Sequence, residues 1–191
     1  MHALSLERAL MAVEKVRERL LRTTGALERH GVPYAVIGGH AVAVWVARVD
    51  EDAVRNTVDV DILLRREDLA RATAALAEVG FDPAEVSGVP VFVERADPRV
   101  KRGVHVIFAN ERVRPYDAHP TPDPTQSQRA EGGFAVIDLI PLLVMKLSAH
   151  RLKDKVHLVD MLDLDMIDAT AMASLPEDLR ARLEALRANP E

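Results

Sequence analysis

The sequence predicts an α+β fold, in which a mixed α/β sheet is followed by a helical C-terminal extension. Three observations support this class. Residues 57–64 alternate between apolar and polar side chains, as a strand does when one face is buried. Apolar residues recur at spacings of three, four or seven near both ends of the chain, which is typical of amphipathic helices. A glycine pair, Gly38-Gly39, follows a short apolar strand and opens a helix.

The first half of the chain is expected to form a long helix, four strands and two shorter helices. Residues 5–30 have helical periodicity, and Gly31 followed by Pro33 is a strong stop signal. The elements after this helix are a strand at 34–37, a helix at 40–47, an acidic loop at 48–55, a strand at 57–64, a helix at 67–79, and strands at 90–94 and 104–108.

A proline- and glycine-rich stretch divides the chain. We expect a core at 1–110, a connecting loop at 111–133 and a helical C-terminal portion at 134–191. Such a long loop is typical of a segment that shields something or acts as a hinge. The C-terminal portion starts with a short strand at 134–137 and continues as a mainly helical segment at 139–164. A last helix begins near Ser174, whose spacing to Glu177 is that of a capping box.

Composition limits the function classes. The chain has 191 residues, with 25 Lys and Arg against 30 Asp and Glu, and a formal net charge of −5. This balance argues against non-specific coating of nucleic acid, although a local basic groove stays open. The absence of cysteine excludes disulfides, thiolate zinc sites and cysteine nucleophiles. We find neither a membrane-spanning apolar run nor a signal peptide, and we therefore expect a cytoplasmic protein with no membrane partner.

The most informative residues are Asp59 and Asp61. On a strand they point to the same side, about 7 Å apart. Two like charges held side by side repel, and a divalent cation between them removes that penalty. Hard carboxylate oxygens suit Mg²⁺ or Mn²⁺. A lone acidic pair would more simply decorate a strand end, but here the strand is apolar and follows the glycine pair.

Gly38 and Gly39 allow two interpretations. Backbone N–H groups at the start of a helix can face an anion, and missing side chains let a phosphate approach closely. Taken alone, the pair is more simply explained by an ordinary tight turn between strand and helix. Neither a Walker loop nor a dinucleotide-binding fingerprint is present.

The glycine pair followed by Arg55-x-Thr57-x-Asp59-x-Asp61 resembles the nucleotidyltransferase superfamily of the polymerase-β type. Within it, the chain is most similar to small bacterial nucleotidyltransferase-like proteins, including the toxin-like AbiEii group. The resemblance implies a nucleotidyltransferase-like core that binds a nucleoside triphosphate with Mg²⁺ or Mn²⁺. It assigns Asp59 and Asp61 to the metal and to catalysis, and the remaining motif residues to the nucleotide. The acceptor, whether RNA, protein or small molecule, stays open.

One position departs from the family pattern. A third carboxylate usually lies on a neighbouring strand and activates the attacking hydroxyl, whereas the strand at 104–108 carries His105 there. A histidine can serve as base or metal ligand, and it can equally be a packed structural residue. Glu94 on the preceding strand is a second candidate for the missing acid. Among the predicted catalytic residues, His105 is therefore the one whose role the family resemblance leaves most open.

A cationic stripe is predicted in the C-terminal portion. Lys146, His150, Lys153 and His157 would share one face of a continuous helix, where they could neutralise a triphosphate or guide RNA. A solvated charged face is the alternative. The pattern is similar to the C-terminal helix of the same family, which implies that Lys146 and Asp154 complete the nucleotide site and that Lys146 also serves catalysis.

Two other functions stay open. A catalytically degenerate protein would have kept the fold and lost the third acid, so that it binds a nucleotide or a partner without turnover. A component of a toxin–antitoxin pair would act mainly through a protein partner.

Overall fold

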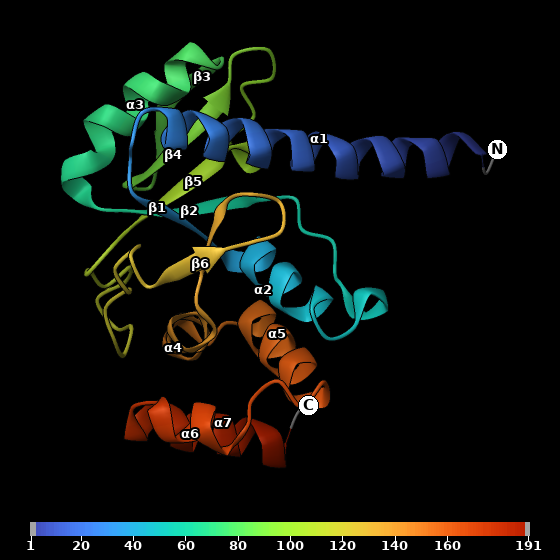
Figure 1. Cartoon of the computed structure of the whole chain (residues 1–191), viewed down its shortest axis with the longest axis vertical. Coiled ribbons are helices and arrows are strands. Elements are labelled where there is room, and N and C mark those ends of the chain that lie inside the picture. The colour runs from blue at the N-terminus through green and yellow to red at the C-terminus, as the bar shows by residue number, and fades with distance from the viewer. Residues whose placement is uncertain (1–2, 190–191) are drawn as a thin grey trace.

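The computed structural model describes residues 3–189 and contains one seven-stranded mixed sheet with helices on both faces (Figure 1). Its strand order is β3-β4-β5-β2-β1-β7-β6. The strands are β1 (Tyr34–Ile37), β2 (Val60–Leu64), β3 (Phe81–Val86), β4 (Val89–Glu94), β5 (Val104–Phe108), β6 (Ser127–Arg129) and β7 (Ala135–Ile137). The predicted mixed α/β class is confirmed.

The helices form layers around this sheet. They are α1 (Ala3–Arg29), α2 (Gly38–Ala47), α3 (Leu69–Glu78), α4 (Leu139–Ala149), α5 (Leu152–Asp163), α6 (Ala169–Ser174) and α7 (Glu177–Ala188). Figure 1 shows α1 and α3 on one side of the sheet and α2, α4 and α5 on the other, with α6 and α7 farther out. Helix α7 packs on both α4 and α5. None of the helices within residues 3–189 has the length and apolarity needed to cross a membrane.

The centre of the sheet is β2, which runs antiparallel to β1 and parallel to β5. Its apolar side chains Val60 and Ile62 are buried, as the alternation predicts. The pairing register places Asp61 beside Ile37 of β1 and beside His105 of β5. Three segments distant in sequence therefore meet at one point of the sheet.

The strand predicted at 57–64 is shorter in the structure. It begins at Val60, and residues 54–59 approach it as irregular chain. Val58, which the alternation places on the buried face, is 61% exposed because it lies in this irregular segment. Asp59 is therefore the residue just before β2, and only Asp61 lies on the strand itself.

The single helical segment predicted at 139–164 is two helices. His150 takes a left-handed conformation with φ of 46° and ends α4, and α5 starts at Leu152. The stripe from Lys146 to His157 along one helix face was therefore a wrong prediction, since the residues belong to two helices.

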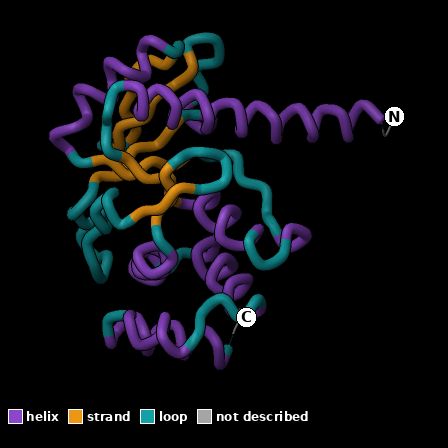
Figure 2. Tube along the Cα trace, viewed as in Figure 1, coloured by secondary structure: helices purple, strands orange, loops and turns teal. Residues whose placement is uncertain are grey.

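Helix α1 extends beyond the body of the protein at its N-terminal end (Figure 2). Its inner half packs into the core through Leu20 and Leu27, which are buried. In its outer half, Leu10 and Val13 belong to the predicted apolar stripe but are exposed, because the sheet does not reach that far.

Candidate functional site

The site is centred on Asp61, where β1, β2 and β5 meet. Asp59 lies two residues earlier, on the segment that leads into β2. Both aspartates line a pocket of about 240 Å³ between α2, residues 53–61 and α5, which we call the α2 pocket. The two carboxylates thus face a common space although only one of them belongs to the strand.

Gly38 and Gly39 are packed against the side chains of this segment. A Cβ atom at Gly38 would lie 2.1 Å from Asp61 Oδ2, and one at Gly39 would lie 2.7 Å from Thr57 Oγ1. Gly38 also has a φ of 68°, which side chains rarely adopt. The glycine pair therefore has a structural role besides letting a phosphate approach. The missing side chains of Gly38 and Gly39 leave room for the side chains of Asp61 and Thr57.

His105 lies next to Asp61. Its Nδ1 atom is 3.5 Å from Asp61 Oδ1, and its Nε2 atom donates to the carbonyl oxygen of Val100 at 3.2 Å. The hydrogen bond with Asp61 raises the pKa of His105 by more than burial of the ring lowers it. Because the Val100 carbonyl fixes a proton on Nε2, Nδ1 donates to Asp61 only in the charged ring, which is the form that the raised pKa favours. The residue is therefore both anchored to the backbone and directed at the aspartates.

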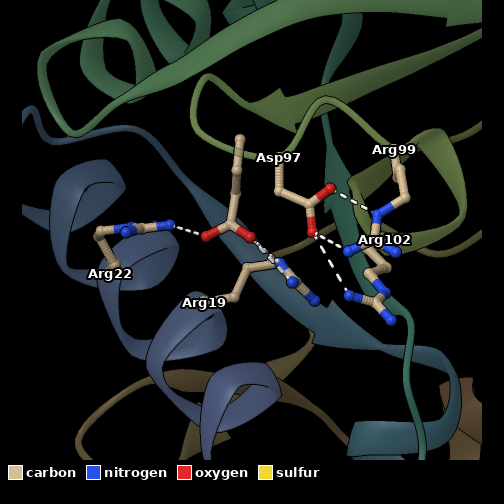
Figure 3. A network of polar contacts seen from close by, with 6 residues as sticks. Arg19, Arg22, Asp97, Arg99 and Arg102 are labelled. Carbon is tan, nitrogen blue, oxygen red and sulfur yellow. Dashed lines mark hydrogen bonds and ion pairs between the residues drawn. The ribbon is translucent and has the colours of Figure 1, made fainter. Parts of the chain in front are cut away.

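The turn that anchors His105 is held by ion pairs. Figure 3 shows Arg99 and Arg102 converging on Asp97, which precedes the short helix Val100–Arg102. This cluster fixes the segment whose Val100 carbonyl binds the imidazole. Two basic residues between β4 and β5, Arg99 and Arg102, are thus paired within that segment.

Glu94, the other candidate for the third acid, is engaged elsewhere. Its carboxylate accepts hydrogen bonds from Arg19 and Arg22 of α1, and Arg19 Nη2 lies 2.9 Å from Glu94 Oε2. Figure 3 shows both arginines extending from the helix toward this point. Glu94 therefore ties α1 to β4, whereas His105 contacts Asp61.

Lys146 lies in a buried polar cluster between α4 and α5. Its Nζ atom is 3.0 Å from Asp154 Oδ1 and 3.0 Å from His157 Nδ1. Lys146 is 4% exposed and Asp154 is 1% exposed. Arg151 completes the cluster with a 2.7 Å bond from Nε to Asp154 Oδ2. The break at His150 lets Lys146 meet residues of the following helix.

The cluster shifts the pKa values of its members in a consistent way. Burial lowers the pKa of Lys146. Burial alone would raise the pKa of Asp154, but the bond from Arg151 and the charge of Lys146 outweigh it and lower that pKa. Burial and the neighbouring ammonium lower the pKa of His157 to about 4. A neutral His157 can accept a hydrogen bond from Lys146, as the geometry requires.

The lowered pKa of His157 predicts a pH-dependent stability. Because the folded pKa lies below the unfolded value, stability is complete above about pH 6.5 and is lost as the pH falls toward the folded pKa. We expect the free energy of unfolding to drop by about 1 kcal/mol more in the wild type than in His157→Gln between about pH 7 and pH 5, after allowance for partial solvent exposure. Urea unfolding at both pH values measures this; parallel pH dependence in the two proteins would contradict it.

The α2 pocket contains two other predicted nucleotide-binding residues. Thr57 lines it beside Gly39. Arg55 lines it too, and its guanidinium makes a two-pronged pair with Asp160 of α5, at 2.5 Å and 2.9 Å. This pair joins the segment before β2 to α5. Asp160 carries no sequence motif, and only the fold shows that it belongs to this pocket.

A second pocket, of about 120 Å³, lies on the other side of Asp61, and we call it the α4 pocket. It is bounded by Gly38, β5, the loop 113–121 and α4. Asp61 and Lys153 line both pockets. Asp117 and Ser148 line only the α4 pocket, and the sequence singled out neither of them. The two pockets thus offer two binding positions that share one carboxylate.

The side chains of the site supply some, but not all, of the ligands that a hard divalent cation needs. Asp59 and Asp61 supply oxygen ligands, and His105 Nδ1 supplies a nitrogen next to Asp61. Within residues 3–189, no three His, Cys, Asp or Glu side chains converge closely enough to hold a metal by themselves. The protein's own residues therefore fit Mg²⁺ or Mn²⁺ only if further oxygen ligands come from a bound substrate and water.

Comparisons with known proteins bear on the family and the fold of the chain. A family described as uncharacterised nucleotidyltransferases matches residues 4–189. A crystal structure of an antigenic nucleotidyltransferase-like protein from Paracoccidioides brasiliensis is similar at 14% identity and a TM-score of 0.59, covering 93% of this chain and 89% of that chain. A crystal structure of ANT(2")-Ia in complex with adenylyl-2"-tobramycin is similar at 15% identity and a TM-score of 0.52, covering 89% of this chain and 95% of that chain.

At these identities the structural likenesses show the fold alone. A search of curated proteins gave no significant match. The family match, by contrast, spans almost the whole sequence and confirms the resemblance inferred from the glycine pair and the aspartate motif. The chain belongs to the family of uncharacterised nucleotidyltransferases.

Proposed function

We propose that the protein transfers a nucleoside monophosphate from a nucleoside triphosphate to a hydroxyl group of an acceptor, with Mg²⁺ or Mn²⁺. The observation that carries this proposal is the meeting of Asp61 with Gly38 and His105 at the centre of the sheet. It places a carboxylate motif against the start of α2, where backbone N–H groups favour an anion. Family membership supports the same reaction class.

Each residue has a role in this proposal. Asp59 and Asp61 would hold the metal, which when bound neutralises charge on the phosphate oxygens. The triphosphate would occupy the α2 pocket, next to the first turn of α2, Thr57 and Lys153. Lys146, which lines the α4 pocket on the other side of Asp61, would offset negative charge that develops during transfer, its ammonium being held in place by Asp154.

His105 replaces the missing acid in this scheme. A cation bound by the aspartates would counter the rise that Asp61 causes in the pKa of His105, and the neutral ring could then accept the proton of the attacking hydroxyl. The bond to Val100 holds the ring beside Asp61.

The aspartate pair provides the decisive test. We expect the wild type to bind a non-hydrolysable triphosphate more tightly with Mg²⁺ than without it. Asp59→Asn and Asp61→Asn should lose this difference, and transfer of labelled nucleotide should fall by about a thousandfold or more. Calorimetric titration and product detection measure the two effects. The matched control is Asp163→Asn at the exposed end of α5.

A second function is favoured by one observation, namely that no third carboxylate joins Asp59 and Asp61 among residues 3–189. It is a nucleotide-binding protein without turnover. Mg²⁺-dependent binding with no product from any triphosphate would support it. Equal affinity with and without Mg²⁺, unchanged by either substitution, would overturn both functions.

A further inference from the structure

The outer half of α1 carries apolar side chains that nothing in the chain covers. Leu10 and Val13 lie one helical turn apart, and they continue outward the row that Val16 and Leu20 bury in the core. Leu10 is 62% exposed. Single exposed apolar residues are common, but these two extend a row that packs elsewhere along the same helix. We call Leu10 and Val13 the apolar row, and it lies where α1 has left the body of the protein (Figure 2).

A line of negative charge runs beside the apolar row. Three exposed glutamates at spacings of seven and four share one edge of α1 next to Leu10, and we call them the acidic row: Glu7, Glu14 and Glu18. Arg8 and Lys15 lie on the other side of the helix, away from the apolar row. Glu14 is paired with Arg17 at 3.2 Å, but this pair is exposed and such pairs contribute little, so Glu14 can exchange it for another cation.

Helix α5 presents a surface of the matching kind. Leu152 is 82% exposed, and Val156, one turn farther along, is exposed too. Lys153 and Lys155 flank these two apolar side chains, one on each side. Whereas Arg151 is bonded to Asp154, neither lysine has an ion-pair partner among residues 3–189. We call this surface the α5 patch, and it consists of Leu152, Lys153, Lys155 and Val156.

The two surfaces are complementary, but one chain cannot join them. Both have two apolar side chains one helical turn apart, and the flanking charges are negative on α1 and positive on α5. Figure 1 shows α1 and α5 on opposite sides of the sheet, and the outer half of α1 points away from the body of the molecule. The acidic row of one chain can therefore meet the α5 patch only in another copy.

We propose that the protein forms a twofold symmetric pair in which the outer half of α1 from each copy packs on the α5 patch of the other. Leu10 and Val13 would contact the apolar side chains of the patch, and the acidic row would face its lysines. Twofold symmetry makes this contact twice, which doubles the buried area. Because Lys153 lines both the α2 pocket and the α4 pocket, each α1 would lie at the rim of the other copy's site. The pairing itself does not rest on the proposed function.

Sedimentation velocity of the full chain tests the apolar part of the contact. We expect the wild type to form pairs with a Kd below about 100 μM. Leu10→Gln and Leu152→Gln should each weaken pairing about tenfold or more, because each places an amide in an apolar contact. Both side chains are exposed in the single chain, so neither substitution should disturb the fold. Met11→Gln is the matched control, since Met11 is also exposed but points away from Val13, and it should pair as the wild type does.

Reversal of charge tests which surfaces meet. Glu7→Lys/Glu14→Lys makes both surfaces of one chain basic, and Lys153→Glu/Lys155→Glu makes both surfaces acidic. Each double variant alone should pair about tenfold more weakly than the wild type, because like charges then face each other. An equal mixture of the two should recover pairing to within about threefold of the wild type, since every contact in the mixed pair joins opposite charges.

Four results would overturn the inference. The wild type could stay a single chain up to about 1 mM. Leu152→Gln could pair as tightly as Met11→Gln, which would mean that α1 does not pack on α5. The mixture of charge variants could pair no more tightly than either variant alone. Finally, the wild type could grow beyond two chains, because an open head-to-tail contact continues where a twofold pair closes. None of these measurements requires a triphosphate or enzymatic activity.

Discussion

Asp154→Ala is expected to lower the free energy of unfolding by about 3–5 kcal/mol, because it leaves the buried ammonium of Lys146 without its carboxylate. The substitution also removes an acceptor for Arg151, whose backbone N–H bonds to Asp154 Oδ2 at 3.3 Å at the start of α5. Urea unfolding at neutral pH measures the loss.

The double variant Lys146→Met/Asp154→Ala is the matched control for this loss. Removing both charges leaves no uncompensated ion, so the double variant should be more stable than Asp154→Ala alone. A loss under about 1 kcal/mol in Asp154→Ala would show that Lys146 finds another partner or gives up its proton.

Gly38→Ala is expected to reduce nucleotide transfer by about a hundredfold or more, since small misplacements of catalytic groups have effects of this size. The new Cβ would lie 2.1 Å from Asp61 Oδ2, so the carboxylate must move away. Transfer of labelled nucleotide and Mg²⁺-dependent triphosphate binding should both fall.

Gly80→Ala controls for the strain of a positive φ. Gly80 has a φ of 87°, but a Cβ there would meet nothing within 4 Å. Both variants should lose stability from the left-handed backbone, by about 1 kcal/mol or more. Only Gly38→Ala should also lose activity, and equal activity in the two variants would mean that Asp61 is not held by the glycine.

Local patterns predicted much of the centre of the molecule. The apolar run before Gly38 gave β1, and the amphipathic spacing after residue 67 predicted α3 to within a few residues. These signals are strong because buried central strands and one-sided helices each impose a clear period on the sequence. The aspartate motif and the glycine pair were recognisable for the same reason, since their spacing is short.

Elements at the edges of the sheet escaped prediction. The outer strand β3 contains Pro83 and two charged residues, Asp82 and Glu85, and β6 at the opposite edge consists of Ser-Gln-Arg. Edge strands tolerate proline and polar residues because one side of the backbone needs no sheet partner. The break at His150 was missed because the chain has no glycine or proline there, although the residue is left-handed.

The contacts that build the site depend on long-range pairing. The parallel alignment of β2 with β5 brings His105 beside Asp61, and no local pattern encodes that register. Asp117 is similar, since it sits in a loop whose length indicated a shielding role but whose carboxylates have no recognisable spacing. The sequence therefore identified the motif residues, and the tertiary structure identified what surrounds them.

The position of β7 has a consequence for how the chain folds as it is synthesised. Val36 of β1 pairs with Val136 of β7, so the sheet closes across a long stretch of sequence. Until residues 135–137 leave the ribosome, one edge of β1 stays open, with its buried apolar side chains and backbone groups exposed. Contacts of this sequence separation are slow to form, and partly made sheets are prone to aggregate. The nascent protein therefore passes through its most vulnerable period late in translation, after most of the site residues have already emerged.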